Sequence, residues 1–327
     1  MRCPGSLAVA VRRPGGQIVV RDDTWRSIWH RFRFLRWPFL RGGVVMIEAM
    51  VNGMQALSFS AKEAIPEEEK KGGESDTTGL GFSLAIGILL VLVLFKVVPH
   101  LAATYAGKLL VGRPFTVDDG VYHLVDGVVK VLIFVGYIAA ISTSKEIKRV
   151  FMYHGAEHMA IFTLEAGEEL TVENASRKST VHPRCGTAFL MVVILLFIIV
   201  AAVLMPFVPA WAKPTPDGPW YRHIIVVLFK LPLLIPVAGM AYEFNRFAGR
   251  HADHPLLRLL LWPGLAMQLL TTKRPTDDQI EVALVAMKTA MRRESEGAGA
   301  AADPMVFDDY EAFSKFLKRT GQERATT

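Results

Sequence analysis

Four apolar runs of bilayer-spanning length constrain this chain more than any other feature of its sequence. A transmembrane helix needs about 20 mostly apolar residues, and two of the runs contain the uncharged stretches ILLVLVLF and FLMVVILLFIIVAAVLM. We therefore predict a mainly α-helical integral membrane protein with about four transmembrane helices and small cytoplasmic α+β elements. The predicted spans are Leu80–Val98 (ending at Pro99), Val121–Ile141, Thr187–Val208 and Ile224–Tyr242.

The distribution of lysine and arginine predicts the orientation. Of the 37 Lys and Arg residues, 30 lie in residues 1–78, 142–186 and 243–327, and four lie in the two remaining loops. Because cytoplasmic segments are enriched in these residues, both termini and the central loop are expected in the cytoplasm. The first 20 residues are broken by charges and proline, so no cleavable signal peptide is expected. Cys3 and Cys185 fall on the reducing side, where a disulfide is not expected.

The second and fourth predicted spans carry charged residues that bear on how they pack. Asp126 and Lys130 lie in the second and Lys230 in the fourth, so these helices are expected to face neighbouring helices and not lipid. Asp126 and Lys130 are four residues apart, which favours a structural ion pair, with a proton path as the alternative.

The segments before the first span predict a basic head. Alternating residues on either side of a PGG turn predict a hairpin over residues 7–22, and helical spacing predicts a helix over Val44–Ala64. Residues 24–41 interleave tryptophan and phenylalanine with arginine. This basic aromatic segment is typical of contact with anionic lipid headgroups, and nucleic-acid binding is the alternative.

The segments after the second span predict further short elements. Residues 169–180 are expected to form a strand with a turn. Residues 256–270 are apolar but too short to cross twice. They are expected to form a helix in the interface or a shallow re-entrant turn, with a break at Pro263-Gly264. Thr276 and Gln279 form a capping box that starts a further helix. The chain divides into the head (1–78), spans one and two (79–142), a central loop (143–186), spans three and four (187–242), an interfacial segment with a helix (243–293) and a variable tail (294–327).

The central loop carries the residues with the strongest chemical signal. Residues 145–167 predict a helix that contains His154, Glu157 and His158 in the pattern H-x-x-E-H. On a helix the two imidazoles share one face and can reach one metal ion, while the carboxylate can accept a proton. The alternative is a hydrogen-bonded histidine pair that anchors loops at the membrane surface.

Polar residues from two other segments are expected at the cytoplasmic surface of the membrane, at the level of the helix with the H-x-x-E-H pattern. His182, Arg184 and Cys185 lie just before the third span, and Glu243 lies at the end of the fourth. We predict His154, His158 and His182 as metal ligands, with Cys185 and Glu243 in reserve and Zn²⁺ as the divalent transition metal. Glu157 is the predicted general base or a further ligand, and Arg184 is expected to steady an anionic group of the substrate or a developing oxyanion.

Four segments together resemble a known family: YHGAEH, HPRCGTAFL, AYEFNR and PGLAMQLLTTKRPTDDQIEVA. They look like the YqhQ family of uncharacterised bacterial membrane proteins, and the likeness covers roughly residues 1–293. The resemblance implies the cytoplasmic membrane of a bacterium and a metal-dependent enzyme. Members open with a segment like GGQAVIEGVMMR, of which this chain carries only Met1-Arg2, so we expect a mis-assigned start or a missing piece.

These observations favour a metal-dependent enzyme, hydrolytic in type, at the cytoplasmic face of the membrane. The competing function is a non-enzymatic factor in membrane-protein biogenesis, because the basic head would suit docking to a ribosome or translocon. A transporter ranks third, since four spans with few buried polar groups offer little from which to build a pathway.

Overall fold

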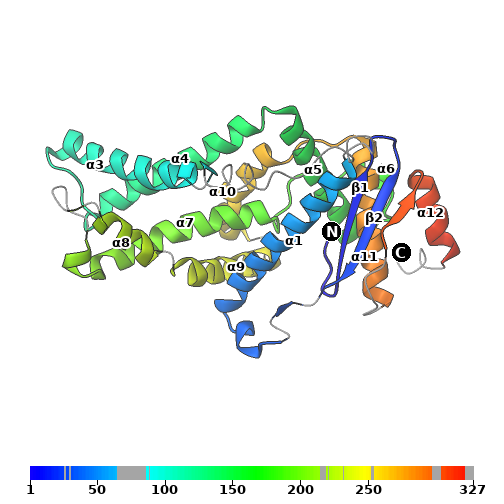
Figure 1. Ribbon diagram of the computed structural model, residues 1–327, viewed down its shortest axis with the longest axis horizontal. Helices are drawn as coiled ribbons and strands as arrows, with labels where there is room; N and C mark the ends of the chain where they lie inside the picture. Colours follow the sequence, from blue (N-terminus) through cyan, green and yellow to red (C-terminus); the bar gives the residue numbers. More distant parts are fainter. Residues whose placement is uncertain are drawn as a thin grey trace.

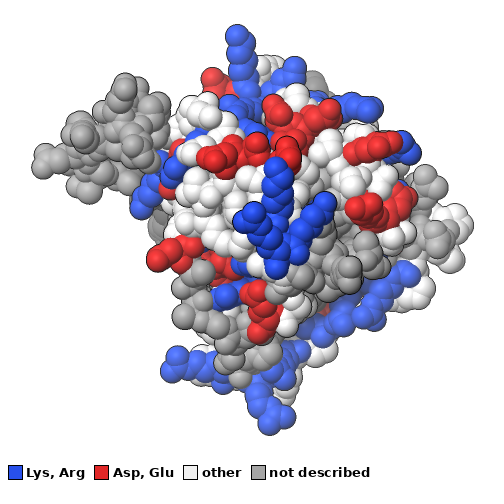
Figure 2. Space-filling model, turned by 90° about the vertical axis from the view of Figure 1, so that its right-hand side faces the viewer, with Lys and Arg blue, Asp and Glu red and all other residues white. Residues whose placement is uncertain are grey.

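The molecule has an apolar end and a polar end. The structure is a computed structural model, and it describes residues 1–25, 27–28, 31–64, 86–87, 89–213, 219, 221–230, 232–251, 254–296 and 303–320. Figure 1 shows a long helical bundle at one end and a small sheet with its covering helices at the other, where both termini lie. Basic and acidic side chains are spread over this sheet end (Figure 2). The sheet end is therefore suited to water.

Within the described residues, four helices are long and apolar enough to cross a membrane. The mainly helical fold and the number of such helices agree with the prediction. Two of them match predicted spans: α4 matches the second, and α7 with the 3-10 turn η5 matches the third. The four helices are α1 (Leu40–Ala64), the helix over Leu89–Val111, α4 (Gly120–Ile141) and the helix over Gly186–Phe207. The last of these comprises α7 (Gly186–Leu204) and η5 (Met205–Phe207).

The first predicted span does not end at Pro99. The helix continues as α3 (Val98–Val111) and stops at Gly112, whose φ of 74° is left-handed. A π turn, η4 (Val93–Val97), precedes the proline. Proline has no N–H to donate to the preceding turn. A π turn rearranges the helical hydrogen bonds at this point, so the helix can continue past Pro99. Residues 80–85 and 88 of the predicted span lie outside the described residues.

α4 contains the ion pair that the sequence predicts. Asp126 and Lys130 form a salt bridge one helical turn apart, and both side chains are largely buried. Pairing within the protein avoids the cost of an isolated charge in an apolar surrounding. The predicted ion pair is confirmed, and both its structural role and the alternative proton path stay predictions.

The fourth predicted span, Ile224–Tyr242, is wrong as a single helix. α8 (Tyr221–Lys230) ends before Pro232, and α9 (Leu234–Arg250) begins after it. Proline lacks an N–H and its ring clashes with the preceding turn, which explains the break. In place of this span, α1 supplies the fourth long apolar helix.

Glycines allow α1 and α9 to pack closely. A Cβ atom on Gly42 would lie 2.6 Å from the Cβ of Tyr242, and one on Gly239 would lie 1.7 Å from the carbonyl oxygen of Phe39. Only glycine fits at such distances, as is common where apolar helices approach one another. α1 is therefore part of the helical bundle at its start, although its far end reaches the sheet (Figure 1).

The predicted break at Pro263-Gly264 is also wrong. α10 (Pro255–Thr271) is continuous through Pro263. Its neighbour Gly264 brings the helix against α7, where an added Cβ would lie 2.9 Å from the Cα of Ala188. Close packing along α7 offsets the local cost of the proline.

The sheet end contains the predicted hairpin and a third strand from the tail. β1 (Ser6–Arg12) and β2 (Ile18–Thr24) pair antiparallel, and β3 (Met305–Phe307) extends the sheet beside β2. Phe59 of α1 packs on one face of the sheet, against Val11 and Val19. The other face is covered by α11 (Asp277–Glu296) and α12 (Tyr310–Arg319), with buried contacts between Ile18, Val20, Val285, Phe313 and Leu317.

A second core joins α5 to α11. α5 (Lys145–Glu165) confirms the predicted helix and ends close to Gly167, which has a φ of 67°. Met159 and Ala160 of α5 pack against Ile280 and Leu284 of α11. At the start of α11, the Gln279 side chain accepts a hydrogen bond from the Thr276 N–H at 3.0 Å, as a capping box requires.

The predicted strand over residues 169–180 is wrong. A short helix, α6 (Val172–Ser176), lies there instead. The Thr171 hydroxyl accepts a hydrogen bond from the Asn174 N–H, which caps the helix, and Ala175 is buried against the α5–α11 core. Local capping and burial therefore override the apparent strand pattern.

Candidate metal centre

His154 and His158 lie on one face of α5, as their spacing predicts. Their ring centroids are 4.4 Å apart. Gly155, which follows His154, lets α5 touch the connection from α10 to α11, since a Cβ there would lie 2.2 Å from the carbonyl oxygen of Lys273. This close approach brings the end of α10 beside the two imidazoles.

Backbone carbonyls orient both imidazoles. The Nδ1 of His154 lies 2.9 Å from the carbonyl oxygen of Thr271, and the Nδ1 of His158 lies 2.6 Å from that of Thr180. A carbonyl oxygen can only accept, so each Nδ1 carries a proton and donates. The Nε2 atoms are then left for a ligand, an arrangement usual for histidines that bind metals.

Cys185 completes a group of three ligand atoms. It occupies the N-cap of α7, and its Sγ accepts a hydrogen bond from the Thr187 N–H at 3.4 Å. The Nε2 of His154 lies 3.2 Å from this sulfur. The ligand atoms of His154, His158 and Cys185 all lie within 4.8 Å of one another, and we call these residues the ligand cluster.

The ligand cluster favours a thiolate. Burial alone would raise the pKa of Cys185, but hydrogen bonds from His154 and His158 outweigh it and lower the pKa to about 5. Burial would lower the pKa of His154, yet the bond to Cys185 and the nearby negative charges leave that pKa raised. At neutral pH Cys185 is therefore a thiolate, and its negative charge favours the protonated form of His154 when no metal is bound. The thiolate is the form of cysteine that binds metals.

His182 lies next to the ligand cluster but is not part of it. Its Nε2 is 3.3 Å from Glu165, and its Nδ1 accepts a hydrogen bond from the Arg184 N–H at 3.2 Å. Burial lowers the pKa of His182, in keeping with a neutral ring that uses both nitrogens in this way. The side chain of Gln268 bonds its backbone N–H and carbonyl, at 2.7 and 2.9 Å. His182 thus positions the loop that carries Cys185.

The predicted general base and anion contact lie at the edge of this region. The Glu157 side chain is 47% exposed, and its charge contributes to the raised pKa of His154. Arg184 is exposed and donates to Glu165 at 2.7 Å. Both side chains are thus accessible from the water beside the ligand cluster.

Glu243, the other reserve ligand, is used elsewhere. Both of its carboxylate oxygens accept hydrogen bonds from the guanidinium of Arg41. This bidentate pair joins α9 to the start of α1. Glu243 therefore stabilises helix packing and is not in the ligand cluster.

Comparison with known proteins identifies the family of this chain. A family model described as "Protein of unknown function (DUF1385)" matches residues 37–293. The chain is also 34% identical over 269 residues to "Uncharacterized protein YqhQ" of Bacillus subtilis (strain 168), covering 79% of this chain and 78% of that protein. This chain belongs to the DUF1385 family. The predicted resemblance is thereby confirmed, and no solved structure matches the chain.

The DUF1385 match contains the whole ligand cluster and the residues that orient it. Sequence reasoning missed Thr180, Gln268 and Thr271. The two threonines act through backbone carbonyls, which any residue type can supply, so no sequence signal marks them. Gln268 did carry a sequence signal, because it is an amide within an apolar run. The structure buries this amide fully, and buried amides need hydrogen-bond partners.

The low pKa of Cys185 gives a direct test by alkylation. In chelator-treated protein, the rate of alkylation by iodoacetamide should rise with pH as the thiolate forms, with a midpoint near pH 5. His154→Ala removes a hydrogen-bond donor to the sulfur and should move the midpoint upward. Labelling of each cysteine is measured by peptide mass spectrometry.

Cys3 provides the internal control, because burial raises its pKa above the usual value. It should remain unreactive across the acidic range. A midpoint for Cys185 at or above that of an ordinary thiol would contradict the hydrogen bonding described here.

Proposed function

We propose that this chain is a metal-dependent enzyme of hydrolytic type, working at the cytoplasmic face of the bacterial membrane. In this proposal His154, His158 and Cys185 hold one divalent transition metal ion, with Zn²⁺ preferred. The observation that carries the proposal is the convergence of three ligand atoms within 4.8 Å, two of them on imidazoles oriented by backbone carbonyls. Cys185 replaces His182 as the third ligand.

The donor set fits the proposed metal. Two imidazoles and a thiolate suit zinc, whereas calcium and magnesium prefer oxygen ligands. Three protein ligands are typical of catalytic zinc sites, while structural sites usually have four. A bound Zn²⁺ would supply Lewis acidity toward a carbonyl or phosphoryl oxygen of the substrate.

The chain's own residues supply the remaining roles. Glu157, on the same helix and half-exposed, would accept a proton from the attacking water. Arg184, held by Glu165, would orient an anionic group of the substrate. His182 would act as a positioning residue for Cys185, since its ring nitrogens are occupied.

The proposed orientation rests on charge and on the position of the ligand cluster. The cluster lies at the junction of α5, α7 and α10, and α7 leads from Cys185 directly into a helix long enough to cross the membrane. The termini lie at the sheet end, which carries many charged residues (Figures 1 and 2). Together with the 30 basic residues expected on that side, this favours a cytoplasmic site.

The biogenesis function is the second candidate. It is favoured by the basic aromatic segment, where Arg31, Arg33 and Phe34 are exposed and the Trp37 side chain is 67% exposed. Such a surface suits lipid headgroups or ribosomal RNA. Arg26 of this segment lies outside the described residues, and Arg41 is paired with Glu243.

Metal content tests the proposed site. Protein purified without chelator should contain about one zinc ion per chain, and His154→Ala, His158→Ala and Cys185→Ala should each reduce the metal to background. His182→Ala should weaken metal affinity by about 10- to 100-fold, because it removes only a positioning residue. The readout is elemental analysis, with Glu243→Gln as the control that keeps its metal.

Background metal in the unsubstituted protein would rule out the proposal in this form. Full loss in His182→Ala together with retention in Cys185→Ala would restore His182 as the third ligand.

Accessibility labelling tests the proposed orientation. A cysteine introduced at Ala210, between α7 and α8, should react with a membrane-impermeant maleimide added outside intact cells, because this loop carries few basic residues. One introduced at the exposed Ser179, beside the ligand cluster, should react only after the membrane is opened. The protein with only its natural cysteines is the control. Labelling at Ser179 from outside would reverse the orientation.

Two variants separate the enzyme from the biogenesis factor. Glu157→Gln removes the proton acceptor while keeping its size, so it should retain metal and fail to complement a deletion strain. The triple change of Arg31, Arg33 and Arg36 to Gln should keep metal and complement almost as the parent does. The reverse pattern, with loss of ribosome co-purification in the triple variant, would favour the biogenesis function, because contacts to RNA depend on such charges.

A further inference from the structure

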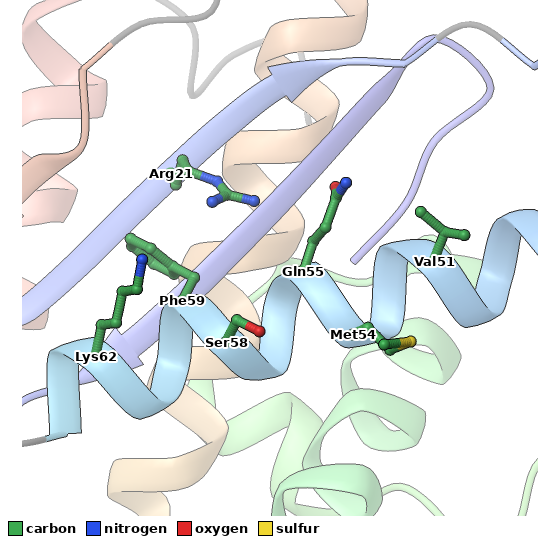
Figure 3. A pocket seen from close by; sticks show the side chains of 7 residues that line it. All are labelled: Arg21, Val51, Met54, Gln55, Ser58, Phe59 and Lys62. Carbon is green, nitrogen blue, oxygen red and sulfur yellow. The ribbon is translucent and has the colours of Figure 1, made fainter. Parts of the chain in front are cut away.

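A groove lies between α1 and the hairpin, on the sheet face opposite α11 and α12. It has a volume of about 510 Å³, and its lining includes Arg21 from β2 and Val51, Met54, Phe59 and Lys62 from α1. Figure 3 shows Arg21, Phe59 and Lys62 gathered toward one end of the groove and Val51 and Met54 toward the other. We call it the α1 groove. Its size is in the range typical of small-molecule sites.

The first end of the α1 groove is cationic. The guanidinium of Arg21 stacks over the ring of Phe59, 4.8 Å from its centroid, and contacts Asp23 at 2.9 Å. Lys62 is exposed in the last turn of α1 and extends toward the same space (Figure 3). Two cations beside one carboxylate leave a net positive charge, which suits an anionic group.

The other end of the α1 groove is apolar and continues onto the outside of α1. Met54 is 63% exposed. The neighbouring exposed residues recur at helical spacing and form one apolar stripe: Ile47, Met50, Val51, Met54 and Leu57. α1 buries Glu48 and Asn52 toward the protein while it presents this stripe outward. Such a face in water would be unfavourable, whereas contact with acyl chains would cover it.

We infer that the α1 groove binds an anionic phospholipid from the leaflet next to the sheet end. The phosphate lies between Arg21 and Lys62, and an acyl chain follows Val51 and Met54 onto the apolar stripe. Charge complementarity selects the headgroup. Continuity of the groove with a helix long enough to enter the membrane selects a lipid over a soluble phosphate. The lipid site stands apart from the ligand cluster and does not depend on a metal there.

Binding of a short-chain lipid tests this inference. The purified full-length chain in dodecyl maltoside is titrated with dioctanoyl-phosphatidylglycerol, and the complex is followed by native mass spectrometry. We expect a one-to-one complex, with dioctanoyl-phosphatidylcholine bound far more weakly. The double change Arg21→Gln and Lys62→Gln should weaken phosphatidylglycerol binding by about 30-fold, given the usual contribution of each basic residue near a lipid surface.

Two further variants make the outcome decisive. Met54→Glu places a negative charge on an exposed position in the path of the acyl chain and should weaken binding without unfolding the protein. The double change Lys318→Gln and Arg319→Gln removes the same charge from exposed positions on α12, across the sheet, and should leave binding unchanged. Zinc content, measured alongside, should be the same in all variants, so the lipid site and the metal site can fail separately.

Equal binding in the Arg21/Lys62 double variant and the α12 control would overturn the inference. So would competition by millimolar inorganic phosphate, which would indicate a site for soluble phosphate. Formation of a dimer that Met54→Glu disrupts, without lipid binding, would show that a second copy covers the stripe instead.

Discussion

Two hydrogen bonds from imidazole to backbone carbonyl orient the rings on which the candidate metal centre depends. The carbonyls belong to Thr271 at the end of α10 and to Thr180 in the loop before α7, while both imidazoles belong to α5. The rings therefore take their orientation from segments distant in sequence. Because α10 and α7 belong to the apolar bundle, the ligand cluster forms only when the bundle and the polar end are assembled together.

The assembly depends on close approaches that few side chains would permit. Gly155 lets α5 touch the chain after α10, and Gly264 lets α10 pack along α7, which begins at Cys185. Gln268 joins the two by bonding the backbone of His182. A movement of α10 along α7 would therefore change the distance between Cys185 and the two histidines. The geometry of the ligand cluster therefore depends on the packing of the helical bundle at this junction.

Sequence alone predicted features that depend on local pattern. Helical spacing put His154 and His158 on one face, and alternation around a PGG turn gave the hairpin. Prediction from sequence failed where tertiary packing decides whether a helix continues. Pro232 breaks a helix, yet Pro99 and Pro263 do not. A π turn accommodates Pro99, and contact of α10 with α7 accommodates Pro263. By residue type the sequence ranked His182 above Cys185 as a ligand, and this ranking stays a prediction. In the structure, hydrogen bonds to Glu165 and Arg184 occupy the ring nitrogens of His182.

The order of the strands has a consequence for synthesis. β1 and β2 precede the long apolar helices in the chain, but β3 and the helices α11 and α12 that cover one face of the hairpin follow them. A hairpin with an uncovered apolar face is only marginally stable and prone to pair with other strands. The helices long enough to cross a membrane are thus made while the sheet is unfinished. The polar end can complete its fold only after α12 has left the ribosome.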